Sequence, residues 1–281
     1  MSTILDTVTF HDGNTAPRIG LGVWQVENDV IVPTIHKAIE AGYRLIDTAA
    51  IYGNETGVGE AIKTCGLDRN ELFITTKLWN DRHGYDETMK AFDESLEKLG
   101  LDYVDMYLIH WPVPKHGLYV KSWEALIQLR DEGRIKSLGV SNFNIGHLQT
   151  LLDETGVIPV VNQIELNPRF QQPELRAYNA EHGIITQSWS PLGQGTLWDL
   201  PILKSIAEKH GRSVAQIVLR WHLQLGNMII PKSVTPARLV ENITLGDFSL
   251  DEDDMAAIAT LHDDDARWGP DPERFRLPKE S

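Results

Sequence analysis

Four side chains that can transfer or hold a proton occur near the ends of apolar runs in the sequence. Asp47 ends a run that begins at Leu45, and Tyr52 follows five residues later in a loop that contains glycine. Lys77 and His110 end two later runs. Taken singly, these residues are more simply explained as a helix-capping aspartate, a packed loop tyrosine, a surface lysine and a core histidine. Because an unpaired ammonium is costly at the end of a buried strand, however, Lys77 needs a carboxylate, and Asp47 ends the adjacent strand.

Together, an aspartate, a tyrosine, a lysine and a histidine at one edge of a sheet predict a proton-transfer site. A tyrosine phenol has an ordinary pKa of about 10, and a neighbouring ammonium lowers that pKa by stabilising the phenolate. Asp47 would hold Lys77 in its charged form. Tyr52 would protonate a carbonyl oxygen as the carbonyl carbon takes a hydride, and His110 would orient the carbonyl. None of these side chains can donate a hydride, so the site requires a cofactor.

Short apolar runs alternate with helical patterns along almost the whole chain. The expected strands are 20–24, the run that ends at 47, 72–77, 104–110, 135–140, 160–164, 184–189 and 228–231. Eight such units in 281 residues fit a closed (β/α)8 barrel of parallel strands, with an open doubly wound sheet as the alternative. We also expect a hairpin over residues 7–19 and two extra helices, at Pro201–His210 and Asp251–Leu261. Because no linker is visible, we expect a single domain over residues 1–281.

Each expected strand brings a polar residue, a glycine or a tryptophan to its C-terminal end. Besides the four proton-transfer residues, the residues at these ends are Gly22, Val23, Trp24, Ser141, Asn142, Gln163, Trp189 and Lys232. In a barrel, the C-terminal ends of the strands meet at one rim, where enzymes of this fold place their active sites. The sequence therefore predicts one pocket that contains all of these residues.

The chain lacks the common phosphate-binding motifs. Gly57-Val58-Gly59 has no third glycine of a Gly-x-Gly-x-x-Gly motif, and there is no Walker loop, no His-Glu-x-x-His motif and no cysteine cluster, so we expect no metal. The stretch from Lys232 to Arg238 offers another anion site, because a cation at a strand end precedes a helix that starts at Pro236. Helix N-terminal amides and two cations can bind phosphate, although a capped helix with surface cations fits the same residues equally well.

The composition favours a globular cytoplasmic protein with a small-molecule substrate. The net charge of −14 argues against nucleic acid or an anionic membrane as partner, because both recruit basic faces. Cys65 is the only cysteine, so no intrachain disulfide can form and a reducing compartment is expected. We see no signal peptide and no apolar run close to the roughly 18 residues that span a bilayer. We expect a monomer.

Three stretches carry a resemblance to a known family. They are Gly42–Gly59, Lys136–Phe143 and Ile230–Leu245. In their order and spacing they make the whole chain resemble an aldo-keto reductase, and within that family the bacterial 2,5-diketo-D-gluconate reductases. The resemblance implies a (β/α)8 barrel with a hairpin at its bottom and an extended NADP(H) bound without a Rossmann domain. It also implies that Tyr52 is the general acid of a tetrad with Asp47, Lys77 and His110.

The resemblance also assigns contacts to NADP(H). Trp189 would stack on the nicotinamide, and Ser141, Asn142 and Gln163 would hold its carboxamide. The nicotinamide ribose would lie over Gly22, Val23 and Trp24, near Asp47. The pyrophosphate would be covered by Ser190, Pro191, Leu192, Gly193 and Gln194. The 2′-phosphate side would contact Lys232, Ser233, Val234 and Arg238, with Glu241 and Asn242 near the adenine. Thr235 stands where some relatives carry a basic residue, which weakens the expected preference for NADP(H) over NAD(H) without reversing it.

The expected substrate pocket has aromatic walls. Its residues are Trp24, Trp79, Trp111 and Trp268, beside Tyr52 and His110, with Asn80 as a polar contact. Such walls accept many aldehydes and ketones, and the resemblance implies dicarbonyls or keto-sugar acids such as 2,5-diketo-D-gluconate. The tail beyond Arg267 is short, so we expect the pocket to be open on that side. Some relatives are NADP(H)-binding regulatory subunits with little turnover, but the intact tetrad favours an oxidoreductase.

Overall fold

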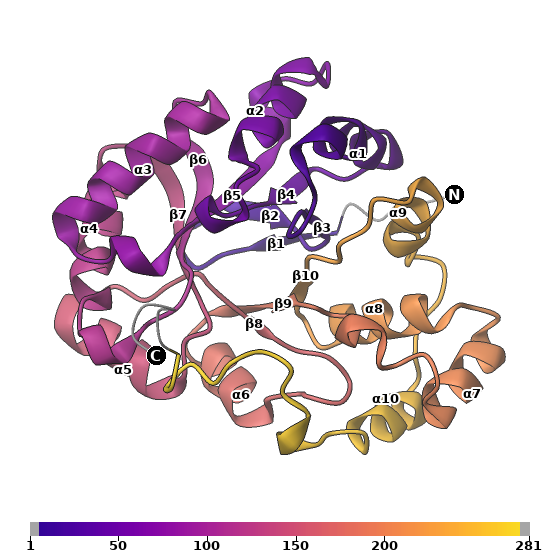
Figure 1. Cartoon of the computed structure of the whole chain (residues 1–281). Coiled ribbons are helices and arrows are strands. Elements are labelled where there is room, and N and C mark those ends of the chain that lie inside the picture. Colours follow the sequence, from indigo (N-terminus) through magenta and orange to yellow (C-terminus); the bar gives the residue numbers. More distant parts are fainter. Residues whose placement is uncertain (1–5, 276–281) are drawn as a thin grey trace.

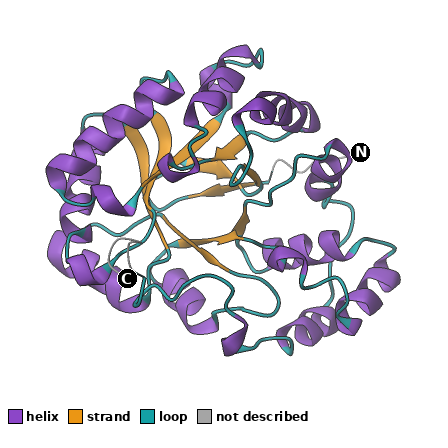
Figure 2. Ribbon diagram, viewed as in Figure 1, coloured by secondary structure: helices purple, strands orange, loops and turns teal. Residues whose placement is uncertain are grey.

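Eight parallel strands form a barrel surrounded by helices in the computed structural model, which describes residues 6–275 (Figures 1 and 2). In barrel order the strands are β3 (Gly20–Gly22), β4 (Leu45–Asp47), β5 (Phe73–Leu78), β6 (Val104–Ile109), β7 (Ile135–Ser141), β8 (Val161–Glu165), β9 (Ile185–Trp189) and β10 (Met228–Ile229). A parallel bridge between Ile19 and Ile229 joins the first strand to the last. The amide of Ile229 donates to the carbonyl of Arg18 at 2.8 Å, and the amide of Gly22 donates to Pro231 at 3.3 Å. This closure confirms the barrel and excludes the open sheet.

A helix follows each strand and covers the outside of the barrel (Figure 2). The helices are α1 (Asn28–Ala41), α2 (Glu55–Thr64), α3 (Tyr85–Leu99), α4 (Tyr119–Asp131), α5 (Ile145–Thr155), α6 (Pro173–Glu181), α7 (Pro201–His210), α8 (Val214–Gln224), α9 (Pro236–Ile243) and α10 (Glu252–Ala259). Helix α7 precedes the helix that packs on β10, and α10 follows the last unit, so both extra helices are confirmed. Within residues 6–275, none of these helices has the length and apolar character needed to cross a membrane.

The expected N-terminal hairpin consists of β1 (Thr7–Thr9) and β2 (Thr15–Pro17), which pair antiparallel. Its apolar side chains Val8, Phe10 and Ala16 are buried in the cluster that fills the barrel interior. Phe10 packs edge to face on Phe73, the first residue of β5, with ring centroids 6.4 Å apart. Because Phe73 starts its strand, the hairpin lies at the N-terminal end of the barrel and leaves the C-terminal rim accessible.

The chain turns sharply between α1 and the strand that carries Asp47. Gly42 follows α1 with a φ of 110°, in the left-handed region, and its amide donates to the carbonyls of Ala38 and Ile39. Such a cap ends a helix in a conformation that favours glycine. The chain therefore enters β4 within three residues, and Asp47 falls at the end of that strand.

The glycine pair of Gly57-Val58-Gly59 serves helix packing. An added Cβ at Gly57 would lie 2.4 Å from the side chain of Ile31 in α1, and one at Gly59 would lie 2.3 Å from the carbonyl oxygen of Leu99 in α3. Both glycines lie in α2. The motif therefore allows α2 to approach its two neighbours closely, which explains why it lacks the third glycine of a phosphate-binding loop.

We expect Gly59→Ala to lower the free energy of unfolding by about 1–3 kcal/mol, because its methyl group would overpack against the backbone of Leu99. Gly146→Ala is the matched control, since a methyl group in α5 would meet no heavy atom within 4 Å beyond its own helix. That control should gain about 0.5–1 kcal/mol from helix propensity. Urea unfolding measures the free energy of unfolding of both variants. Equal changes in that free energy would contradict the packing role of Gly59.

Candidate active site

The four predicted proton-transfer residues lie together at the C-terminal rim, with Lys77 at their centre. Its Nζ donates to Asp47 Oδ1 at 2.5 Å and to the carbonyl of Thr48 at 2.8 Å, and it lies 3.5 Å from the Tyr52 hydroxyl. Lys77 and Asp47 are both fully buried. The neighbouring strands β4 and β5 bring the two residues together, because Asp47 pairs with Thr75, two residues before Lys77. The predicted pairing of Lys77 with Asp47 is confirmed.

The loop that carries Tyr52 is held by one buried asparagine that we did not identify from the sequence. Tyr52 ends a single 3-10 turn, Ala50–Tyr52, after β4. Asn54 accepts a hydrogen bond from the Thr48 hydroxyl at 2.7 Å, and its amide nitrogen donates to the carbonyls of Val23 and Val26 at 2.9 and 3.1 Å. The loops after β3 and β4 are thus joined, which fixes the turn on which Tyr52 sits. Its position beside Gly53 was the available signal, because asparagine commonly binds backbone groups in turns.

Burial and the local charges act in opposite directions on the pKa of each ionisable group. Burial raises the pKa of Asp47, and the charge of Lys77 and hydrogen bonds from Lys77 and Gln163 lower it only partly. Burial lowers the pKa of Lys77, but the combined attraction of Asp47 and Tyr52 outweighs burial and leaves that pKa raised. Lys77 is therefore held as an ammonium.

The pKa of Tyr52 differs from the value expected from the sequence. Burial raises it, the charge of Lys77 lowers it, and Asp47 raises it, so that the net direction is upward. The predicted effect of Lys77 has the right sign, but the net lowering of the pKa was wrong because the expectation did not include burial of the phenol. In the protein alone, Tyr52 therefore keeps its proton at neutral pH and is ready to donate it.

His110 is a neutral imidazole against the tyrosine. Burial and the charge of Lys77 hold its pKa well below the ordinary value of 6.5. Its ring lies edge to face with those of Tyr52 and Trp79, at centroid distances of 5.8 and 5.2 Å. Nδ1 is buried and has no hydrogen-bond partner among the described residues. A neutral imidazole can donate one hydrogen bond, as a role in orienting a carbonyl oxygen requires.

A network of buried amides connects the tetrad to the opposite side of the rim. Gln163 Nε2 donates to Asp47 Oδ2 and to Gln187 Oε1, both at 2.8 Å. Asn142 accepts from the indole nitrogen of Trp189 at 2.8 Å, and its amide donates to the Ser141 hydroxyl and to the carbonyl of His110. The structure therefore brings together the residues predicted to hold a carboxamide. Gln187, which lies within β9, is a member of this network that the sequence analysis missed.

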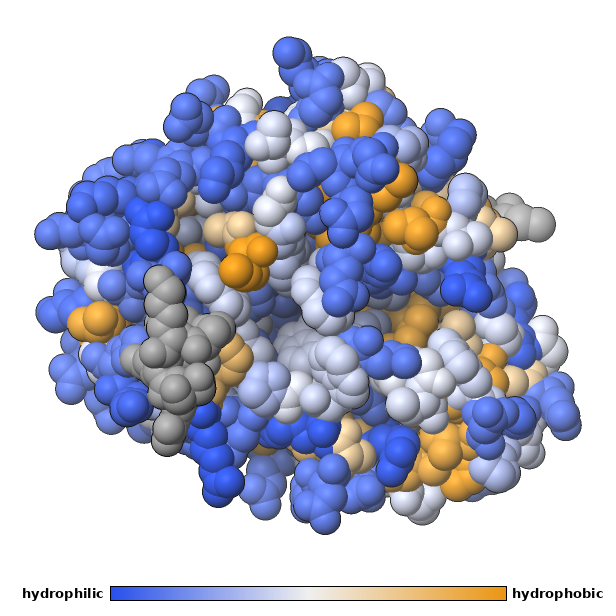
Figure 3. Space-filling view, in the orientation of Figure 1, coloured by the Kyte–Doolittle hydropathy of each residue, from blue (hydrophilic) through white to orange (hydrophobic). Residues whose placement is uncertain are grey.

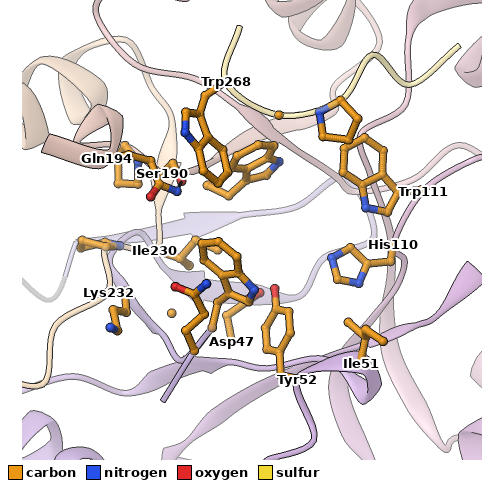
Figure 4. A pocket seen from close by; sticks show the side chains of 18 of the residues that line it. Asp47, Ile51, Tyr52, His110, Trp111, Ser190, Gln194, Ile230, Lys232 and Trp268 are labelled. Atoms are coloured by element: carbon orange, nitrogen blue, oxygen red, sulfur yellow. Dashed lines mark hydrogen bonds between the residues drawn. The ribbon is translucent and has the colours of Figure 1, made fainter. Parts of the chain in front are cut away.

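A cavity of about 480 Å³ lies above the tetrad and opens near the middle of the face shown in Figure 3. Figure 4 shows Trp111 and His110 at one end of the cavity and Lys232 at the other, with the Tyr52 hydroxyl pointing between them. The predicted residues that line it are Gly22, Trp24, Asp47, Tyr52, Trp79, His110, Trp111, Trp189, Ser190, Pro191, Leu192, Gln194, Lys232 and Trp268. The aromatic wall is therefore confirmed.

Other predicted contacts lie outside this cavity. Asn80 is buried, does not line the cavity, and its amide atoms have no partner among the described residues. Val23 is fully buried, and Gly193 lines a smaller neighbouring cavity. Ser233, Val234, Arg238, Glu241 and Asn242 lie at the start of α9 or along it. Gly22 lines the cavity, but an added Cβ there would lie 2.7 Å from the carbonyl of Ile230, so a glycine at this position also serves barrel closure.

The C-terminal tail covers one side of the cavity. Trp268, Gly269, Pro270 and Phe275 all line it, and the ring of Phe275 stacks on that of Trp111 at 4.6 Å. The expectation of an open side was wrong, because tail length alone does not determine the path of the tail. Lining residues that the sequence analysis missed are Gln25, Ile51, Ile230, Pro231, Gly269, Pro270 and Phe275.

Comparison with known proteins assigns the family. Residues 18–263 match the model of the aldo/keto reductase family. Methylglyoxal reductase DkgA of Escherichia coli K12 is 54% identical over 270 residues, which cover 95% of this chain and 97% of that protein. An aldo/keto reductase structure from Brucella melitensis is 57% identical, with a TM-score of 0.90 over 93% of this chain and 99% of that one. A variant of Gox0644, solved in complex with NADPH, is 49% identical, with a TM-score of 0.94 over 97% and 99% of the two chains. The chain belongs to the aldo/keto reductase family.

Removal of the buried ammonium tests the role of Lys77. We expect Lys77→Met to lower the free energy of unfolding by about 3–5 kcal/mol at neutral pH, because Asp47 would remain buried without its cation. In the variant, the pKa of Asp47 in the folded protein rises further above its unfolded value. The folded state then holds a proton that the unfolded state releases, so the stability deficit should shrink as the pH falls.

The measurement is urea unfolding of wild type and Lys77→Met between pH 5 and pH 8. The matched control combines Lys77→Met with Asp47→Asn, which removes the charge that would be left behind. It should recover part of the lost stability and show less dependence on pH. A deficit that is independent of pH in the single variant would contradict the pairing.

Proposed function

We propose that this chain reduces aldehydes and ketones to alcohols with NADPH, and that Tyr52 is the proton donor. The observation that carries the proposal is the half-buried Tyr52 hydroxyl, 3.5 Å from Nζ of Lys77, which pairs with Asp47 at the base of an aromatic cavity. Family membership supports carbonyl reduction, and a structural relative was solved with NADPH. The nicotinamide of NADPH, when bound, supplies the hydride.

Each residue of the site has a separate role in the proton transfer. As negative charge develops on a carbonyl oxygen in the cavity, Tyr52 donates its proton to that oxygen. The ammonium of Lys77 stabilises the phenolate that remains, and Asp47 and the Thr48 carbonyl hold the ammonium in place. His110, neutral at working pH, donates a hydrogen bond that orients the carbonyl. Such general acid catalysis typically contributes a factor of about 10²–10⁴ to the rate.

The cavity and its surroundings fit an extended dinucleotide phosphate. Within the cavity, the half-buried indole of Trp189 offers a flat apolar surface next to the amide network. At one end, Lys232 lines the cavity just before the N-terminus of α9, where Arg238 is exposed. The positive end of the helix dipole and two cations can attract the 2′-phosphate. No carboxylate occurs between Lys232 and Arg238 to favour a free ribose hydroxyl.

For the substrate, we propose α-dicarbonyls, methylglyoxal first, with the anionic keto-sugar acid 2,5-diketo-D-gluconate as a larger candidate. DkgA, which shares 54% identity over nearly the full length, is named a methylglyoxal reductase. Trp24, Trp79, Trp111, Trp268 and Phe275 give the cavity room and apolar surface for substrates larger than methylglyoxal. An apolar cavity of this volume accepts many small molecules and takes their orientation from a few polar groups.

Tyr52→Phe tests the proposed acid. The change keeps the ring and deletes only the proton donor, so we expect NADPH binding to persist while methylglyoxal reduction falls by about 10²-fold or more. The assay follows NADPH oxidation by absorbance and NADPH binding by tryptophan fluorescence. Turnover near the wild-type rate would remove Tyr52 from its role. Absence of any reduction by the wild-type protein, with NADPH still bound, would instead favour a regulatory subunit.

Arg238→Ala tests the proposed 2′-phosphate contact. Loss of a hydrogen bond between charged groups should raise the Kd of NADPH by about 10- to 100-fold, and added salt should narrow the difference from wild type. The Kd of NADH should change little, because it lacks the phosphate. Lys204→Ala, on α7 and paired with Asp199, is the control for loss of a surface cation. An equal rise in the Kd of NADPH and of NADH would place Arg238 away from the 2′-phosphate.

A further inference from the structure

The segment after α10 runs along one side of the barrel rim and forms part of the cavity wall; we call residues 263–275 the strap. In Figure 1 it is the yellow segment that runs from α10 past α6. Its first residue, Asp263, donates its amide to the carbonyl of Arg169 at 2.8 Å. Near its end, Glu273 accepts a hydrogen bond from the Asn144 side chain at 3.0 Å and lies 3.3 Å from His147 Nε2.

Between these two ends, a buried carboxylate binds two consecutive amides of the strap, and Arg267 lies over the ring of Phe170 at 4.5 Å. Glu165, the last residue of β8, is 1% exposed. Its Oε1 accepts the amide of Trp268 at 2.7 Å, and its Oε2 accepts the amide of Gly269 at 2.8 Å. Hydrogen bonds to an ionised acceptor are about twice as strong as neutral ones, so two on adjacent residues form a firm attachment. Neither the proposed proton transfer nor the proposed cofactor contacts use this residue.

The attachment is closely packed as well as hydrogen-bonded. An added Cβ at Gly269 would lie 2.7 Å from Cη2 of Trp189 and 3.1 Å from Glu165 Oε2. Burial raises the pKa of Glu165, and the two amides and Arg267 lower it only partly. A buried carboxylate is therefore kept here at an energetic cost, and its two oxygens both bind the strap.

The strap places two aromatic rings on the cavity wall. Trp268 lies edge to face with Trp24, at a centroid distance of 6.1 Å, and Phe275 stacks on Trp111 at 4.6 Å. Trp24 and Trp111 belong to loops after β3 and β6. The position of the strap thus decides how far apart the aromatic surfaces lie, whereas the buried pair of Lys77 and Asp47 is formed by residues of β4 and β5.

We propose that Glu165 is a positioning residue that sets the size selectivity of the cavity by fastening the strap. The inference rests on the proposed carbonyl reduction. A substrate with a large apolar group needs the aromatic surfaces of Trp268 and Phe275, whereas a small dicarbonyl reaches only the tetrad. Loosening the strap therefore weakens binding of the larger substrate and leaves the chemical step unchanged.

Hydrogen exchange tests the attachment without any activity measurement. In Glu165→Ala, the amides of Trp268 and Gly269 lose their acceptors, so peptides that cover them should exchange faster than in wild type. Glu165→Gln keeps one acceptor oxygen and should show an intermediate effect. Glu181→Gln, an exposed carboxylate at the end of α6, is the matched control and should not change the exchange. Unchanged exchange in Glu165→Ala would overturn the proposal.

Kinetics with a matched pair of substrates test the selectivity. Methylglyoxal and phenylglyoxal carry the same dicarbonyl and differ in the methyl or phenyl group. For Glu165→Ala we expect the KM of phenylglyoxal to rise by about 10-fold, because its ring loses contact with the aromatic side chains of the strap. The KM of methylglyoxal and both kcat values should stay unchanged.

The outcomes separate this proposal from the proposed function. Equal changes of KM for the two substrates, or a fall in kcat for both, would overturn the selectivity role even if exchange is faster. If wild type oxidises NADPH with neither dicarbonyl, the proposed function fails and the selectivity fails with it. The exchange experiment then still decides whether Glu165 fastens the strap.

Discussion

The buried pair of Lys77 and Asp47 is the constraint on which the rest of the site depends. Two charges removed from water are tolerated only if the protein replaces the water with well-placed partners. Here the partners come from three parts of the barrel: the carbonyl of Thr48 after β4, the phenol of Tyr52 on its short turn, and the amide of Gln163 on β8. The barrel must therefore be closed and in register before the pair is stable. Because Gln163 also binds Gln187, the pair is linked across the rim to the strand that carries Trp189.

The division of the rim into a chemical half and a binding half follows from this arrangement. Strands β4, β5 and β6 end in the tetrad, while β7 to β10 end in amides, an indole and a lysine. The two halves are joined by the hydrogen bonds from Gln163 to Asp47 and from Asn142 to the carbonyl of His110. The strap adds a third part that reaches the cavity from outside the βα units. The attachment of this third part is the pair of hydrogen bonds that Glu165 accepts from Trp268 and Gly269.

Much of this architecture could be predicted from the sequence, for a physical reason. Asp47 and Lys77 end consecutive strands of a parallel sheet, and such strands usually lie side by side, so their pairing followed from order alone. The barrel fold followed from the alternation of strand and helix patterns along the chain. By contrast, Gln187 and Glu165 act through hydrogen bonds to groups far along the chain, and no local pattern marks them. For Asn54 the available signal was its place beside Gly53 in a turn. The direction of the pKa of Tyr52 was missed because proximity of a charge can be inferred from strand ends, but the extent of burial cannot. The path of the tail depends on the bonds of Glu165 and Glu273, which length and composition do not reveal.

The seam between β3 and β10 has a further consequence. Strand β10 has two residues, and the backbone hydrogen bonds across this seam include those from Ile229 to Arg18 and from Gly22 to Pro231. Regions with few backbone bonds open locally at a lower free energy than the rest of a domain. The seam between β3 and β10 is thus the part of the barrel where local opening is expected first. After β10 the chain continues through Pro231 and Lys232, opposite Gly22. A ligand that contacts both edges would hold the seam closed, and its affinity would appear as slower local opening there.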